Sequence, residues 1–144
     1  MTQDYYGTKR VTAWRDDNPE VDDVLRPGEG YAVKYEDGYI SWSPKEVFEA
    51  AYQPITAMNF GHALQALKDG HRVARAGWNG KGMWLRLIEP YDQGDQFSVT
   101  ELPDMDGTLT AHPWMKTADG KLVPWLCSLT DMMAEDWQIV EDQT

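Results

Sequence analysis

The chain has 144 residues and carries 24 Asp and Glu side chains against 13 Lys and Arg, a formal net charge of −11. Such acidity excludes general binding to nucleic acid polymers or to an anionic membrane, because phosphate surfaces attract basic proteins. With 42% hydrophobic residues, the composition is that of one globular domain with at most a small appendage. No apolar run is long enough to span a membrane and the N-terminal residues do not form a signal peptide, so we expect a cytoplasmic protein.

The charge and the aromatic residues are distributed unusually. Residues 68–88 carry a net charge of +4, so the rest of the chain carries −15, and a small anion could bind this basic island. The chain has 7 Trp and 7 Tyr but only 3 Phe, and such amphipathic rings are favoured at interfaces and in ligand pockets. Cys127, the single cysteine, cannot form an internal disulfide, and its apolar neighbours predict a buried side chain. The cysteine and the three histidines do not have zinc-ligand spacing, and we expect neither a metal nor a cofactor.

In chain order, residues 1–57 are expected to form an N-terminal module. Residues 14–29 are acidic and contain proline, which predicts a loop. Residues 30–42 alternate apolar and polar side chains around Asp37-Gly38, which predicts a β-hairpin. A helix is expected over residues 44–52, with Ser43 as its capping residue.

Residues 58–144 are expected to form the main, ligand-binding domain. Asn59 is predicted to cap an amphipathic helix that ends at Gly70, and Thr130 to cap a second, short helix through about Glu135. Glu135 and Asp136 are then expected to be exposed acids at a helix end. Strands are predicted at residues 71–76, 83–88, 97–102, 114–117, 121–125 and 137–140. This order, with local hairpins and no regular crossovers, predicts an α+β fold with a mainly antiparallel sheet.

Two segments could bind a ligand. The first is the glycine-rich turn Gly77–Gly82, where Gly80 and its neighbours offer backbone N–H groups, and Trp78, Asn79 and Lys81 offer a stacking face, an amide and a positive charge. It is neither a Walker A motif nor a dinucleotide fingerprint, and the alternative is that it only turns a hairpin.

The second segment includes Ser128, Thr130 and Asp131, short polar side chains at a helix start, where free N–H groups favour an anion. The alternative here is plain helix capping, with Ser128 or Thr130 as the cap and Asp131 in the first turn. Nothing in the sequence favours catalysis, since neither His62, His71 nor His112 lies near a recognisable nucleophile. We therefore assign no catalytic residue.

Residues 58–88 and 114–140 closely resemble a phage and bacterial domain family, the second type of Thoeris anti-defence sponge. The helix, the glycine-rich turn, the hairpin Lys116–Gly120 and the ending Thr130–Trp137 occur in the family's order. Residues 5–10 and 37–44 look like a module found ahead of various phage proteins, and no role is implied for it.

The resemblance implies a non-catalytic protein that binds cyclic nucleotide immune signals, namely glycocyclic ADP-ribose isomers or, in some members, cyclic oligonucleotides. It also implies a homotetramer whose ligand pockets lie between protomers. The ligand-binding positions that it implies are Phe60, Trp78, Asn79, Lys81, Trp125, Ser128, Thr130 and Asp131, and we expect Arg75 or Lys81 beside a pyrophosphate. At Leu129 many relatives carry a polar residue, which bears on the ligand's identity. The alternatives are a structural or adaptor protein that uses its aromatic residues for oligomerisation, and a nucleotide hydrolase.

Overall fold

The computed structural model describes residues 1–21, 24–88 and 110–141. The chain forms two compact units, Met1–Gln53 and Pro54–Thr144, and each is described by itself. The strand predicted at residues 97–102 lies outside the described residues. Among the described helices, none combines the length and the apolar character that crossing a bilayer requires.

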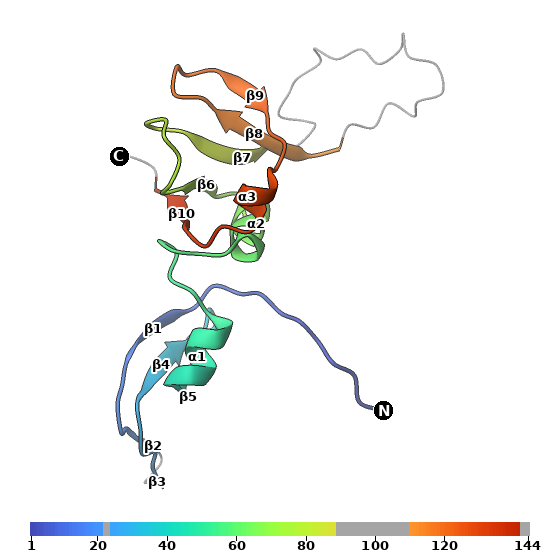
Figure 1. Ribbon diagram of the computed structural model, residues 1–144. Coiled ribbons are helices and arrows are strands. Elements are labelled where there is room, and N and C mark those ends of the chain that lie inside the picture. The colour runs from blue at the N-terminus through green and yellow to red at the C-terminus, as the bar shows by residue number, and fades with distance from the viewer. Residues whose placement is uncertain (22–23, 89–109, 142–144) are drawn as a thin grey trace. The chain divides into compact units, whose positions relative to one another are not determined.

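The N-terminal unit contains a three-stranded antiparallel sheet in the order β1-β4-β5, and one helix (Figure 1). Its elements are β1 (Thr12–Arg15), β2 (Glu20–Val21), β3 (Val24–Leu25), β4 (Gly30–Lys34), β5 (Ile40–Pro44) and α1 (Lys45–Ala51). The predicted hairpin is confirmed. Gly38 adopts a positive φ of 88°, and the Tyr39 N–H donates to the Asp37 carboxylate at 3.0 Å.

Two expectations for this unit were wrong. Residues 14–29 are not simply a loop, because β1 pairs with β4 and the short strands β2 and β3 pair with each other. Ser43 does not cap α1, because it is still paired with Tyr31 in the sheet and the helix begins only after Pro44. The Lys45 N–H donates to the Glu29 carbonyl instead, at 3.0 Å.

The second unit is built on a five-stranded sheet in the order β10-β6-β7-β8-β9, in which every neighbouring pair is antiparallel (Figure 1). Its strands are β6 (Arg72–Arg75), β7 (Trp84–Ile88), β8 (His112–Lys116), β9 (Leu122–Pro124) and β10 (Trp137–Val140). Its helices are α2 (Phe60–Lys68) and α3 (Leu129–Met132). The chain is thus α+β with antiparallel sheets and short helices, as predicted.

One face of this sheet packs against α2. The helix begins as predicted, with the Asn59 side chain accepting the His62 N–H at 2.9 Å, and it is followed by Gly70 at a φ of 91°. Ala63, Ala66 and Leu67 of the helix are buried in one cluster with side chains of the sheet. The sheet contributes Val73, Leu85 and Trp137, each 0% exposed.

Helix α3 is shorter than expected and has a different cap. Ser128, not Thr130, is the N-cap residue, and its side chain accepts the Asp131 N–H at 3.1 Å. Thr130 lies inside the helix and is exposed. Thr130 as the cap was wrong, whereas the alternative that Ser128 caps the helix is confirmed. Ser128 and Thr130 are both good caps, and the sequence gives no rule for choosing between them.

Candidate functional site

Asp131 of α3 draws together three of the predicted site residues. Its Oδ1 accepts hydrogen bonds from Arg75 Nη1 at 2.9 Å and from Trp78 Nε1 at 3.1 Å, and its Oδ2 accepts one from Ser128 Oγ at 2.8 Å. The Arg75 and Asp131 side chains are only 17% and 14% exposed. The family resemblance placed residues of the two segments in one site, and the structure brings these residues together as hydrogen-bond partners of one another.

Asp136 completes this cluster and was missed. It was expected to be an exposed acid at a helix end, but its carboxylate accepts Arg75 Nε and the Gly77 N–H, both at 2.8 Å. A Cβ on residue 77 would lie 2.9 Å from that carboxylate, so Gly77 permits the close approach. No signal in the sequence separates Asp136 from Glu135, because the partners of Asp136 lie about 60 residues earlier in the chain. Arg75, Trp78, Ser128, Asp131 and Asp136 are called the Asp131 cluster below.

The cluster keeps its charged groups ionised. Hydrogen bonds from Arg75 hold the pKa of Asp136 below its ordinary value, against an opposing effect of burial, and the Gly77 N–H adds to the decrease. Burial raises the pKa of Asp131, but hydrogen bonds from Arg75, Ser128 and Trp78 together outweigh it, so the pKa is lowered. Hydrogen bonds to Asp136 and, next, to Asp131 raise the pKa of Arg75. Two carboxylates therefore face one guanidinium, which leaves the cluster with a net negative charge.

The aromatic site residues meet around Trp137, which is fully buried. Trp78 and Trp125 contact it edge to face, with ring centroids 5.4 and 6.1 Å away, and Phe60 contacts it at 5.6 Å. Trp137 Nε1 donates to the Asp131 carbonyl at 2.9 Å, which joins these rings to the Asp131 cluster. Phe60, Trp78 and Trp125 are each half-buried, so part of each ring remains accessible.

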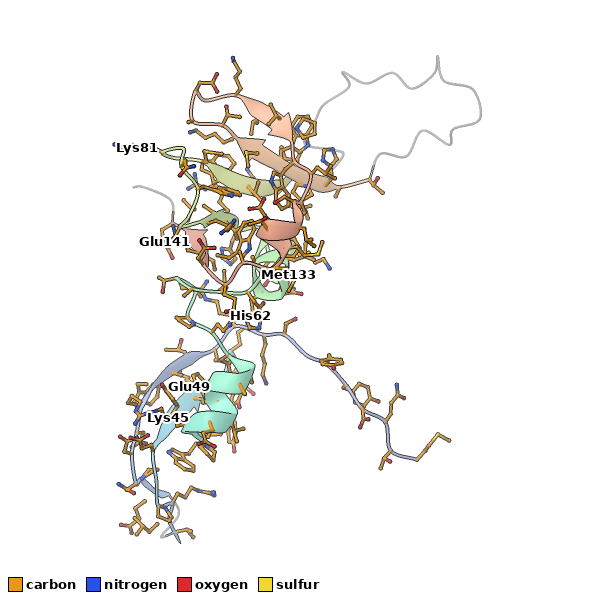
Figure 2. All side chains as sticks on the ribbon, viewed as in Figure 1. Lys45, Glu49, His62, Lys81, Met133 and Glu141 are labelled. Atoms are coloured by element: carbon orange, nitrogen blue, oxygen red, sulfur yellow. The ribbon has the colours of Figure 1, made fainter. Side chains whose placement is uncertain are left out.

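The remaining site residues have other surroundings. Asn79 and Lys81 are exposed in the turn, and Figure 2 shows Lys81 at the outer tip of its loop. Gly80 is half-buried, and a Cβ there would overlap the Met83 side chain, so a larger residue at this position would require Met83 to move. Cys127 is half-buried rather than buried, and partial burial raises the pKa of its thiol.

This arrangement is suited to stacking more than to phosphate binding. Arg75, expected beside a pyrophosphate, already directs three nitrogens at Asp131 and Asp136. The partly exposed rings of Trp78 and Trp125 can still receive a flat heterocycle. In the described parts of the chain, no three His, Cys, Asp or Glu side chains are grouped so that they could hold a metal ion.

Comparison with known proteins identifies similar sequences. The model of the Thoeris anti-defense 2-like domain family matches residues 58–140, which span both segments of the site. A protein of Bacillus phage SP01 named Thoeris anti-defense 2 is 43% identical over 89 residues, which cover 59% of this chain and 97% of that protein. The residues that match the family model lie entirely within the second unit.

Proposed function

Because the chain belongs to the Thoeris anti-defense 2-like family, we propose that it binds a cyclic nucleotide immune signal and withholds it from the host's effector. An anti-defence role follows from the family itself. The finer part of the proposal concerns the ligand, for which the family resemblance favours a glycocyclic ADP-ribose isomer. The family match over both site segments is the observation that carries the proposal.

The aromatic residues support a nucleotide as the ligand. Trp78 and Trp125 are half-buried, and each packs edge to face against the buried Trp137. These contacts fix the orientation of both rings before a ligand binds. Stacking of a base on such a ring contributes about 1–3 kcal/mol. Rings that are already fixed lose little side-chain entropy on binding, which favours high affinity.

Exposed apolar side chains beside the site support self-association. Leu126, Leu129 and Met133 are 91%, 75% and 73% exposed, and they flank Ser128 and Asp131. Large apolar side chains that are exposed at several nearby positions are typical of protein–protein contacts. We propose that another copy of the chain covers them in a homotetramer, and that it helps to enclose the ligand.

The proposed role is sequestration without chemical conversion. Cys127 is a poor nucleophile, because burial raises the pKa of its thiol and so favours the unreactive form. Asp131 and Asp136 are tied to Arg75 and are held ionised, which does not suit a general acid.

Native mass spectrometry of the full chain mixed with glycocyclic ADP-ribose isomers and cyclic oligonucleotides tests the proposal. The expected result is a tetramer carrying an unmodified ligand, which heating releases at its original mass. A ligand recovered as a hydrolysed product would indicate the nucleotide hydrolase instead. Failure to bind any of these molecules would overturn the proposal.

A structural or adaptor role is the second candidate, and one observation favours it. Arg75, Trp78, Ser128 and Asp131 bond to one another, as expected for residues that only hold the fold together. In that case Trp125→Ala would leave the anti-defence effect in cells unchanged as long as the oligomer survives. Under the binding proposal, the same variant loses the effect while the oligomer persists.

A further inference from the structure

The three-stranded sheet of the N-terminal unit has a helix on one face only. Helix α1 lies against β4 and β5 (Figure 1), and its Phe48 stacks on Tyr31 with ring centroids 4.3 Å apart. Side chains alternate along β4, so Tyr31 points toward α1 and its neighbour Ala32 points away. The antiparallel registers place three rows on the face that points away from α1. These rows, called the outer face below, are Asp16, Gly30 and Pro44; Trp14, Ala32 and Trp42; and Thr12, Lys34 and Ile40.

The outer face leaves large apolar side chains in solvent. Trp14 and Ile40 are 45% and 51% exposed, although both belong to the sheet. Among the described residues of this unit, the buried hydrophobic side chains are Ala32 and Val33. A small unit gains stability from an apolar sheet face when another element packs against that face. The outer face therefore has the composition of a core that is covered on one side only.

The Trp42 ring makes the outer face flat. The ring lies over Gly30, because a Cβ at residue 30 would overlap its atoms. Trp42 Nε1 donates to the Asp16 carbonyl at 2.7 Å, on the far side of β4. The indole therefore lies along the sheet, from β5 across β4 toward β1, and the hydrogen bond fixes its position. A flat aromatic surface of this kind is suited to face-to-face packing against a second sheet.

Two opposite charges lie on either side of the central tryptophan row. The Asp16 carboxylate is in one outer row and the Lys34 ammonium is in the other, and neither has an ion-pair partner among the residues that the structure describes. When two copies of this face meet with their rows in reverse order, the row of Asp16 in each copy lies against the row of Lys34 in the other. Rows in the same order would instead bring the two Lys34 side chains together, which is repulsive. The charges therefore favour one arrangement of two copies.

We propose that the outer face binds the outer face of a second copy of the chain, in a two-fold symmetric contact that pairs Asp16 of each copy with Lys34 of the other. The face spans three strands about 5 Å apart and three rows about 7 Å apart. It is smaller than a standard protein–protein interface, so we expect a weak, micromolar dimer. All nine residues lie outside residues 58–140, which match the family. The contact is thus separate from the ligand site and from the contact proposed at α3.

Sedimentation velocity of the full chain carrying Leu129→Asp tests the proposal, because this change removes the contact proposed at α3. We expect this starting chain to be monomeric at low micromolar and dimeric at high micromolar concentration. Adding Trp14→Glu should keep it monomeric throughout, with the fold checked by circular dichroism. Adding Val47→Glu is the matched control and should leave the dimer intact, because Val47 is exposed on α1. A starting chain that is monomeric at every concentration, or an equal effect of the two added changes, would overturn the proposal. A starting chain that stays tetrameric would contradict the contact at α3, and the comparison of the two added changes would still test the outer face.

Charge exchange gives a second test that removes no apolar surface. In the same starting chain, Lys34→Asp and Asp16→Lys are each expected to weaken the dimer roughly tenfold, because each brings like charges together. The double variant should recover the affinity, since it restores both pairs with reversed sign. Glu46→Lys is the matched control for Asp16→Lys and should leave the dimer unchanged, because Glu46 is exposed in the first turn of α1. No recovery in the double variant would contradict the pairing of Asp16 with Lys34.

Other occupants of the outer face give different results. Nuclear magnetic resonance with a soluble paramagnetic agent reports whether the indole N–H of Trp14 is open to solvent in the starting chain. A monomer with a shielded Trp14 would mean that another part of the same chain covers the face. A monomer with an accessible Trp14 would leave the face to a different protein. Either result would overturn the proposal.

Discussion

The carboxylate of Asp136 binds Gly77 as well as Arg75, since it accepts the backbone N–H of Gly77 and Nε of Arg75, each at 2.8 Å. The first residue of the glycine-rich turn is thereby attached to the segment that leads into β10. The Ala76 N–H donates to the Asp136 carbonyl at 3.0 Å and reinforces the attachment. The turn thus starts from a fixed point, although its outer residues are exposed.

Replacing Asp136 should therefore loosen the turn. Asp136→Asn leaves a neutral acceptor for one of the two donors, and we expect a loss of about 1–2 kcal/mol in the free energy of unfolding. This is the usual value for a hydrogen bond to a charged group, reduced because the side chain is 34% exposed. Urea denaturation measures the loss. The neighbouring Glu135→Gln serves as control, because Glu135 is exposed, and an equal loss in both variants would contradict the role of Asp136.

The same contacts predict how stability depends on pH. The pKa of Asp136 is lowered below its ordinary 3.8, mainly by Arg75, so its stabilising contribution is present above pH 3.8 and is lost as the pH falls through the lower, folded-state value. We expect the stability difference between the original chain and Asp136→Asn to be constant from pH 5 to pH 7 and to vanish in stronger acid. Thermal melts of both chains, recorded from pH 7 down into stronger acid, test this pH dependence. A difference that grows on acidification would have the wrong sign.

The sequence predicted local structure well and long-range partners poorly. The hairpin at Asp37-Gly38 and the helix from Asn59 to Gly70 were predicted because their signals lie within a few residues of one another. Strand β1 was missed because its stability comes from pairing with β4. The acidic residues that follow it contain no local signal that predicts such a pairing. Asp136 was missed for the same reason, since its partners lie in β6 and the turn. Grouping Arg75, Trp78, Ser128 and Asp131 into one site depended on the family resemblance, because spacing alone does not connect the two segments.

Trp137 and Trp114 differ in the hydrogen bonding of the indole N–H, so the same substitution should affect them differently. Trp137→Phe removes the donor to the Asp131 carbonyl and shrinks a fully buried side chain, so we expect about 2–4 kcal/mol of destabilisation. Trp114→Phe removes an indole N–H with no partner in the described ranges, and we expect a smaller loss. Urea titrations of both variants measure the difference. If Trp114→Phe were the more damaging change, the indole of Trp114 would have a partner that matters.

Ligand binding should depend on Trp125. Trp125→Ala removes a half-buried stacking surface beside Phe60 and Trp137, and we expect the affinity for the immune signal to fall roughly tenfold or more. Isothermal titration calorimetry measures the affinity, and native mass spectrometry checks that the oligomer is intact. Trp14→Ala is the control, because Trp14 is 45% exposed in the N-terminal unit, outside the residues that match the family. Similar affinities in the two variants would show that Trp125 does not stack on the ligand.

Self-association should depend on the apolar residues around α3. Leu129→Asp places a charge where we propose that a second copy of the chain packs, and burying an unpaired carboxylate is so costly that the oligomer should dissociate. The folded chain itself should be little affected, because Leu129 is 75% exposed and belongs to no buried cluster among the described residues. Sedimentation velocity reports the oligomer, and circular dichroism reports the fold. Val47→Asp is the matched control, since Val47 is 62% exposed on α1 in the other unit. If Leu129→Asp stayed a tetramer while Val47→Asp dissociated, the contact between copies would lie in the N-terminal unit, and the ligand pocket could not be completed at α3.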